Sequence, residues 1–217
     1  MGKRYIPAKR VRSEIEVLNS RFIATLGPVF TVEEAKAFIA EVKAEFADAT
    51  HNVPLFVVGH GGAVTAHCSD DGEPSGTAGR PALAVLQGSG LGDVAAVVTR
   101  YYGGTKLGTG GLVRAYGDAI RAVLEDVRWA EKVATVSLLL SMPYSWLEQV
   151  RLLVEEYEGV IEEEDFGVDV MMEMRLRRER REEFEAALTA LTHGQLEALL
   201  AGEDEATIML VEKPEGD

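Results

Sequence analysis

The sequence contains one cysteine, Cys68, and four histidines. A lone cysteine cannot form an internal disulfide, and the histidines lack the spacing of zinc ligands. No apolar run approaches the roughly 20 residues that a transmembrane helix needs. The charged N-terminal stretch has no apolar segment of the kind that secretory signals carry. These absences predict a cytoplasmic protein without a membrane partner, and we expect neither a metal nor a cofactor.

The net negative charge comes entirely from the second part of the chain. The net charge is -14, from 22 Lys and Arg against 36 Asp and Glu. Residues 1–132 contain 15 residues of each sign, whereas residues 133–217 contain 7 basic and 21 acidic residues. A polyanion can approach the neutral first part, whereas the acidic second part would repel it. In a chain of 217 residues, this asymmetry indicates two domains, each able to bury a core.

Glycine is concentrated in one region, with 12 of the 22 glycines between Gly72 and Gly117. The first cluster, here called the acidic segment, spans residues 69–81 and reads S-D-D-G-E-P-S-G-T-A-G-R-P. The second, the basic segment, spans residues 99–117 and reads T-R-Y-Y-G-G-T-K-L-G-T-G-G-L-V-R-A-Y-G. Glycine accumulates where the backbone needs a positive φ or a close approach. Because both segments also carry charged side chains, we predict that the functional site lies there.

The first part of the chain has the pattern of an α+β domain. The hydrophobic periodicity predicts strands over 11–17, 21–29, 54–59, 63–68 and 93–102, and helices over 31–50, 80–87 and 112–127. Thr31 and Glu34 have the spacing of a helix N-terminal capping box. A turn over 59–62 joins the third and fourth strands. The two glycine-rich segments then lie at strand ends and helix starts.

The second part alternates strands and helices in a recognisable order. Strands are predicted over 133–141, 160–165, 168–176 and 206–211, with helices over 144–156 and 178–191. This βαββαβ order is typical of the ferredoxin-like fold. The join lies near residues 128–132, so we expect domains over 1–130 and 131–217. Residues 212–217 are expected to be a frayed acidic tail.

The basic segment has the features of a phosphate or nucleic-acid site. Three glycines precede a predicted helix, whose free N–H groups and partial positive charge favour an anion. Basic side chains add full charges, and a tyrosine on the preceding strand can stack on unpaired bases. The candidate contact residues are Arg80, Arg100, Tyr101, Tyr102, Gly104, Lys106, Gly108, Gly110, Gly111 and Arg114. An alternative is that the glycines serve tight turns and the basic side chains pair with the acidic segment.

Strict phosphate motifs are absent, and the acidic segment has an open role. Lys106 precedes Gly108, whereas a Walker A loop needs Lys after its last glycine. The acidic segment, with Asp70, Asp71, Glu73 and Ser75, is read either as a turn-forming loop or as a cation site. The first reading is favoured because the spacing breaks the EF-hand pattern. Ser75 is not in a G-x-S-x-G elbow, so we assign no catalytic residue.

At these two segments the chain resembles the YigZ/IMPACT family. Residues 70–81 and 100–116 carry the resemblance, which covers roughly residues 20–125. The stretches R-F-I-A at 21–24 and H-N at 51–52 resemble further landmarks of the family. The chain differs from the family directly after H-N at 51–52. Family members commonly have cysteine and aromatic residues there, whereas this chain has Val53-Pro54-Leu55.

The resemblance implies a fold and a cellular process. The fold is a domain like the second domain of ribosomal protein S5, followed by a ferredoxin-like domain. This pair is similar to the last two domains of the translocase elongation factor, which enter the ribosome. Eukaryotic members restrain a translational stress kinase by competing for its activator protein.

We therefore expect a cytoplasmic, non-enzymatic binding protein that acts in translation or its regulation. Its expected partners are RNA or the ribosome, with a translation-associated protein as a further candidate, and not DNA. The basic segment would make the contact. The alternative is an enzyme that uses the same segment to hold a nucleotide or a phosphate ligand.

Overall fold

The chain forms two compact units in the computed structural model, which describes residues 4–60 and 63–213. The first unit comprises Met1–Glu131 together with Met209–Asp217, and the second comprises Lys132–Ile208. The return of the C-terminal segment to the first unit was not predicted. No helix in the described part of the chain is long and apolar enough to cross a membrane.

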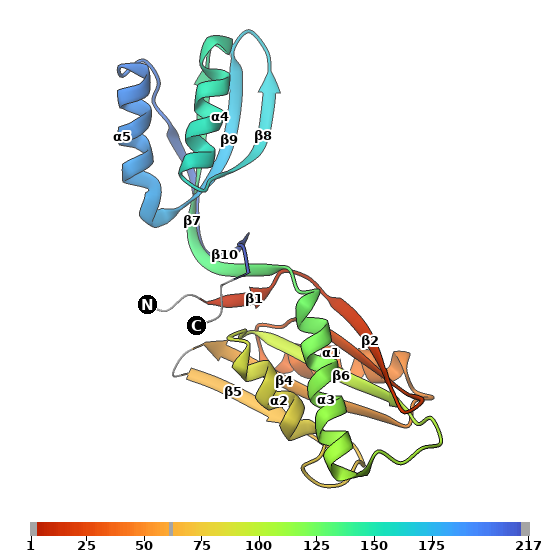
Figure 1. Cartoon of the computed structure of the whole chain (residues 1–217). Helices are drawn as coiled ribbons and strands as arrows, with labels where there is room; N and C mark the ends of the chain where they lie inside the picture. The colour runs from red at the N-terminus through yellow and green to blue at the C-terminus, as the bar shows by residue number, and fades with distance from the viewer. Residues whose placement is uncertain (1–3, 61–62, 214–217) are drawn as a thin grey trace. The chain divides into compact units, whose positions relative to one another are not determined.

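The first unit is built on a five-stranded antiparallel sheet with the order β2-β3-β6-β4-β5 (Figure 1). Its strands are β2 (Val11–Val17), β3 (Ser20–Pro28), β4 (His51–His60), β5 (Ala63–Cys68) and β6 (Val94–Tyr101). The apolar run of β6 is buried along nearly its whole length, in keeping with its central place in the sheet. A short strand, β1 (Tyr5–Pro7), pairs with the start of β7 (Trp129–Met142) and was not predicted.

Helices cover both faces of this sheet. They are α1 (Val32–Glu45), α2 (Gly79–Gly88) and α3 (Gly108–Glu125). α1 packs on one face, where Ala35 and Phe56 belong to a small core. α2 and α3 pack on the other face over the main core, to which Leu55 and Tyr116 belong. Neighbouring residues of a strand point to opposite faces, which explains why Leu55 and Phe56 lie in different cores.

The start of α1 follows the predicted capping pattern. Thr31 is the N-cap, and its hydroxyl accepts a hydrogen bond of 3.1 Å from the backbone N–H of Glu34. The Glu34 carboxylate accepts in turn from the N–H of Phe30 at 2.7 Å, one residue earlier than in a standard capping box. The helix ends at Glu45, short of the predicted Thr50.

The basic segment differs from the prediction at the start of α3. This helix begins at Gly108, four residues before the predicted start at Leu112. Gly108, Gly110 and Gly111 therefore belong to its first turn and not to a loop that precedes it. Hydrophobic periodicity cannot reveal a turn that lacks apolar side chains, and glycine has a poor helix propensity.

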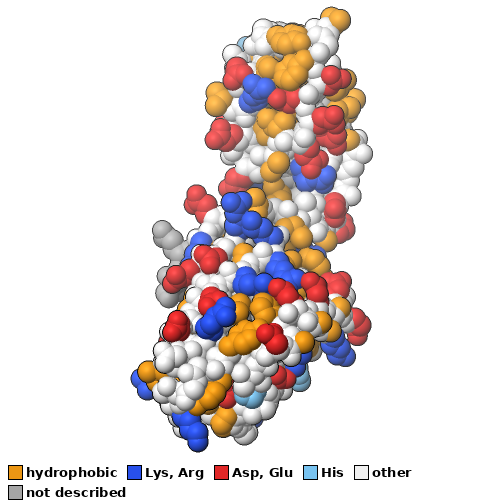
Figure 2. Space-filling model, turned by 90° about the vertical axis from the view of Figure 1, so that its right-hand side faces the viewer, with side chains coloured by type: hydrophobic (Ala, Val, Ile, Leu, Met, Phe, Trp, Pro, Cys, Tyr) orange, Lys and Arg blue, Asp and Glu red, His pale blue; other side chains and the backbone are white. Residues whose placement is uncertain are grey.

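The second unit follows the predicted order of strands and helices. After β7 come α4 (Leu147–Glu156), β8 (Val160–Phe166), β9 (Val170–Arg177), α5 (Arg181–Thr192) and β10 (Leu199–Leu210). The strand order is β10-β7-β9-β8. Leu138, Met172 and Phe184 belong to its core. Figure 2 shows acidic side chains spread over this unit on the face that it presents.

Two predicted features lie outside the described residues. They are the glycine turn at residues 61–62 and the C-terminal tail beyond residue 213.

Candidate functional site

The acidic segment is folded around its first carboxylate. The Asp70 side chain accepts hydrogen bonds from the backbone N–H groups of Gly76 (2.7 Å), Ala78 (3.1 Å) and Gly79 (2.8 Å). Burial opposes ionisation, but these three bonds outweigh it and hold the pKa of Asp70 below its ordinary value. Because Gly79 opens α2, Asp70 fixes the path of the chain into that helix.

Asp71 ties the same segment to neighbouring elements. One carboxylate oxygen lies 2.5 Å from Nζ of Lys43 on α1. The other accepts from the N–H of Asn52 on β4 at 2.7 Å, and the Asp71 carbonyl lies 2.7 Å from Nδ1 of His51. Among the described residues, no group of three or more His, Cys, Asp and Glu side chains is placed to hold a metal ion. The turn-forming interpretation of the acidic segment therefore fits these contacts.

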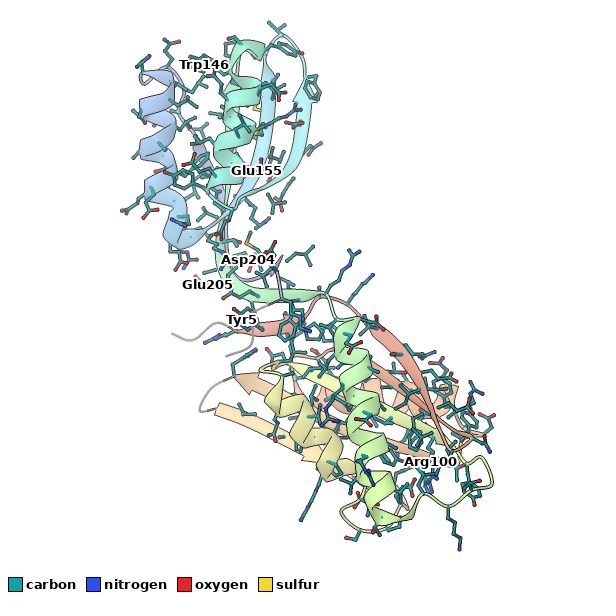
Figure 3. The ribbon with its side chains drawn as sticks, viewed as in Figure 1. Tyr5, Arg100, Trp146, Glu155, Asp204 and Glu205 are labelled. Atoms are coloured by element: carbon teal, nitrogen blue, oxygen red, sulfur yellow. The ribbon has the colours of Figure 1, made fainter. Side chains whose placement is uncertain are left out.

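A buried charge pair joins the acidic segment to the basic one. Nη1 of Arg100, at the end of β6, lies 2.6 Å from Oε1 of Glu73, and the two side chains are 7% and 4% exposed. The Tyr116 hydroxyl, on α3, donates to the same Glu73 oxygen at 2.8 Å. Burial and the Glu73 charge raise the pKa of Tyr116 far above its ordinary value. Figure 3 labels Arg100 beside the first turns of α3.

This pair gives Arg100 a partner within the protein. Its guanidinium is buried and bound to Glu73, which is the internal pairing that the alternative interpretation of the basic segment anticipated. Tyr116 was not predicted to be part of the site. Its position on the apolar stripe of a predicted helix suggested only a core residue, and no signal in the sequence marked its hydroxyl.

A pocket of about 460 Å³ opens where the two segments meet. Its lining residues are Glu73, Pro74, Arg100, Tyr102, Lys106, Leu107, Gly108, Thr109 and Leu112. Lys106 is exposed, and the Tyr102 ring is 45% exposed and lies over the Arg100 guanidinium at 5.5 Å. Four of the predicted contact residues, Arg100, Tyr102, Lys106 and Gly108, therefore line one cavity.

The start of α3 lines this pocket and has no side-chain cap. Leu107 is its N-cap and makes no side-chain capping bond, and no acidic residue lies in the first turn. The first N–H groups of a helix have no partner within the helix and carry a partial positive charge. Gly108 and Thr109 line the pocket, so the backbone of this first turn forms part of the pocket wall.

The glycines of the basic segment fall into two classes. At Gly103 an added Cβ would lie 1.9 Å from the carbonyl oxygen of Asn19, so the fold itself demands glycine. Gly104 and Gly108 have φ angles of +88° and +70°, which glycine adopts most readily. Gly110 has neither constraint: its φ is not positive, and none of the described residues has an atom within 4 Å of an added Cβ. Packing within the protein does not explain this glycine.

The remaining predicted contact residues lie outside the pocket lining. The Tyr101 hydroxyl donates to Asp48 at 2.7 Å, and Arg21 lies over its ring at 5.5 Å. Tyr101 is the last residue of β6 and Tyr102 follows the strand, and the two rings lie in different surroundings. Arg80 is exposed at the start of α2, and Arg114 is exposed on α3. Gly104 and Gly111 do not line the pocket, and Ser75 is exposed on the acidic segment.

Comparison with known proteins identifies the family. The Impact N-terminal domain matches residues 18–124, and a domain of unknown function, DUF1949, matches residues 140–195. The IMPACT family member YigZ of Escherichia coli is 40% identical over 195 residues, which cover 89% of this chain and 96% of YigZ. This chain belongs to the IMPACT family.

Two further similarities extend over most of the chain. The IMPACT family member YvyE of Bacillus subtilis is 38% identical over 182 residues, covering 84% of this chain and 83% of YvyE. A crystal structure of a hypothetical protein superposes with a TM-score of 0.60 at 39% identity, covering 94% of this chain and all of the other. The family resemblance predicted from the acidic and basic segments is thereby confirmed.

Proposed function

We propose that this IMPACT family protein is a non-enzymatic, cytoplasmic binding protein that acts in translation or its regulation. In this proposal it contacts RNA, on its own or in the ribosome, and holds a phosphate at the start of α3. The observation that carries the proposal is the uncapped first turn of α3, which opens into a pocket beside the exposed Lys106. A helix N-terminus supplies backbone donors and a favourable dipole to a phosphate.

Gly110 provides independent support. A glycine within a helix is less favourable than alanine by about 0.5–1 kcal/mol, so one that no contact requires needs another reason. A phosphate that lies against the backbone of the first turn is such a reason, because a Cβ at this position would stand in its way. The exposed Tyr102 ring offers a surface on which an unpaired base can stack.

We also infer the folds of the two domains that the family resemblance implies. The order β7-α4-β8-β9-α5-β10, with strands arranged β10-β7-β9-β8, supports a ferredoxin-like second domain. We infer a first domain like the second domain of ribosomal protein S5, with a boundary near residue 130. A role in translation rests on the resemblance to the family, whose eukaryotic members restrain a translational stress kinase by competing for its activator protein.

The competing function is an enzyme that binds a nucleotide in the same pocket. A cavity of about 460 Å³ is large enough for a small ligand. However, the pocket carboxylate, Glu73, already accepts hydrogen bonds from Arg100 and Tyr116. Its Oε1 atom is therefore engaged within the protein, which makes Glu73 poorly placed to accept a proton from a substrate.

The test is a salt titration of RNA binding with the Lys106→Ala variant. Fluorescence anisotropy with a single-stranded RNA oligonucleotide gives the slope of log affinity against log salt. Loss of one phosphate contact should weaken binding and reduce the steepness of this slope by about 0.7. Lys9→Ala, at an exposed lysine outside the pocket, is the matched control. An unchanged slope and affinity in Lys106→Ala would refute the phosphate site.

A thermal-shift screen against nucleotides, with and without magnesium, separates the two functions. A saturable shift that Lys106→Ala abolishes would favour the nucleotide enzyme. RNA binding without any nucleotide shift would favour the binding protein.

A further inference from the structure

The two edges of the sheet in the first unit are built differently. β2 carries Arg12, Glu14 and Glu16, of which Arg12 binds Glu45 at 2.7 Å and Glu14 binds Arg21 at 2.7 Å. Such charges protect an edge strand against pairing with another chain. β5 reads A-V-T-A-H-C, with no Lys, Arg, Asp, Glu or Pro and no bulge in its register. β5 therefore lacks the usual protective features.

The free backbone groups of β5 can be assigned by alternation. The N–H of Ser69 donates to the carbonyl of Pro54 across the β4–β5 pair. In an antiparallel pair, alternate residues bond to the partner strand, so Thr65 and His67 also face β4. The N–H and C=O groups of Val64, Ala66 and Cys68 then point outward. No other strand in the described residues pairs with this edge.

Cavities lie on both faces of the β4–β5 pair. One, of about 540 Å³, lies between α1 and the sheet and includes Val32, Ile39, Phe56 and His67 in its lining. The other, of about 360 Å³, lies on the α2 face and includes Val57, Val64 and Leu91. The side chains of an added strand would alternate between these two cavities.

The charges on α1 indicate which side chains a strand added beside β5 would carry. On the flank toward β2, Glu41 and Glu45 pair with Arg10. On the flank toward β5, Lys36 and Lys43 line the larger cavity. Lys43 is paired with Asp71, whereas the exposed Lys36 has no ion-pair partner among the described residues. This flank therefore favours acidic side chains on the α1 face of an added strand.

We propose that β5 is a docking edge for an extended segment of a partner protein, which adds to the sheet as a further strand. The segment has apolar side chains on the α2 face and acidic side chains on the α1 face, where Lys36 receives them. Main-chain hydrogen bonds to Val64, Ala66 and Cys68 supply affinity, and the cavities supply specificity. A second copy of this chain fits less well, because pairing two β5 strands would bring both lysine-bearing flanks to the same face.

The probe is a heptapeptide of alternating valine and glutamate, with the valine–lysine peptide as its matched control. We expect saturable binding of the acidic peptide to the full chain, about tenfold tighter than the basic peptide. Lys36→Glu should reverse this preference, whereas Lys9→Glu should leave it unchanged. Ala66→Pro should abolish binding, because its ring would occupy the outward side of the strand, where proline is structurally tolerated.

Amide hydrogen exchange gives a readout that does not depend on these variants folding. The peptide should slow exchange at Val64, Ala66 and Cys68 and leave Thr65 and His67, which already bond to β4, unchanged. Protection at other amides, or no saturable binding up to about 1 mM peptide, would overturn the proposal. Concentration-dependent protection of β5 without peptide would also overturn it and would assign the edge to a second copy of the chain.

Discussion

Glu73 and Arg100 form a buried ion pair at 2.6 Å that connects the acidic segment to the end of β6. Both residues were expected to lie in a functional site, and they do line one pocket. Both charged groups, however, have partners within the protein. Arg100 donates a hydrogen bond to Glu73, and Glu73 also accepts one from the Tyr116 hydroxyl. The pair connects the two glycine-rich segments, whereas Lys106 is exposed at the same pocket.

Removal of the Glu73 charge should destabilise the first unit strongly. Glu73→Gln leaves the Arg100 guanidinium buried without a counter-charge, and breaking such a pair costs about 3–5 kcal/mol. The free energy of unfolding from urea titration measures this loss. Glu41→Gln, which removes an exposed partner of Arg10, should change stability little. The double variant Glu73→Gln, Arg100→Met should be more stable than Glu73→Gln alone; equal losses would contradict a dominant role of the uncompensated charge.

Asp70 should make stability depend on acid pH. Its folded-state pKa lies below the ordinary value, after burial is outweighed by the backbone bonds from Gly76, Gly79 and Ala78. A group of this kind stabilises the fold above its unfolded pKa, near 3.9, and loses that contribution as the pH falls through the folded value. Asp70→Asn removes this dependence.

The measurement is the free energy of unfolding between about pH 7 and pH 2. The unmodified chain should lose stability more steeply below about pH 4 than Asp70→Asn does. Asp118→Asn, at an exposed carboxylate that pairs with Arg121, should follow the unmodified chain. Parallel curves for Asp70→Asn and the unmodified chain would show that the N–H bonds to Asp70 contribute nothing.

Gly103 should tolerate no side chain. An alanine Cβ would lie 1.9 Å from the Asn19 carbonyl oxygen and 2.1 Å from its carbon, and the backbone on both sides would have to shift. We expect Gly103→Ala to lose about 1–3 kcal/mol or more of unfolding free energy. Gly88→Ala is the control, because Gly88 is the last residue of α2 and, within the part of the chain that the structure describes, no atom lies within 4 Å of an added Cβ. Equal stabilities of the two variants would contradict the close approach.

Much of the fold follows from local patterns, and the exceptions have local causes. Val11–Val17 was predicted at its observed bounds, and Thr31 was identified as an N-cap, because alternation and capping act within a few residues. The early start of α3 was missed because its first turn is rich in glycine and lacks apolar periodicity. The sequence alone locates the glycines but does not show which of them must be glycine because a distant segment of backbone lies close by.

The site shows the same limit. The sequence located the acidic and basic segments, and the structure brings parts of both to one pocket. The choice between partners within the protein and a ligand could not be made, because a charge pair between residues 73 and 100 depends on tertiary contact. The answer differs by residue: Arg100 is paired inside the fold, whereas Lys106 is exposed at the pocket.

Substitution of Gly110 should change RNA affinity without reducing the stability of the fold. Gly110→Ala places a methyl group in open space on the first turn of α3, so stability should be kept or raised by up to about 0.5 kcal/mol. If a phosphate lies against this turn, the same methyl group should weaken RNA binding in anisotropy titrations.

Gly117→Ala, farther along α3, is the matched control. Its Cβ would make only ordinary contacts with Arg121 and Val85, so it should raise stability without changing RNA affinity. Equal RNA affinity of the two variants would mean that no ligand approaches the backbone at Gly110, and the helix start would lose its assigned role.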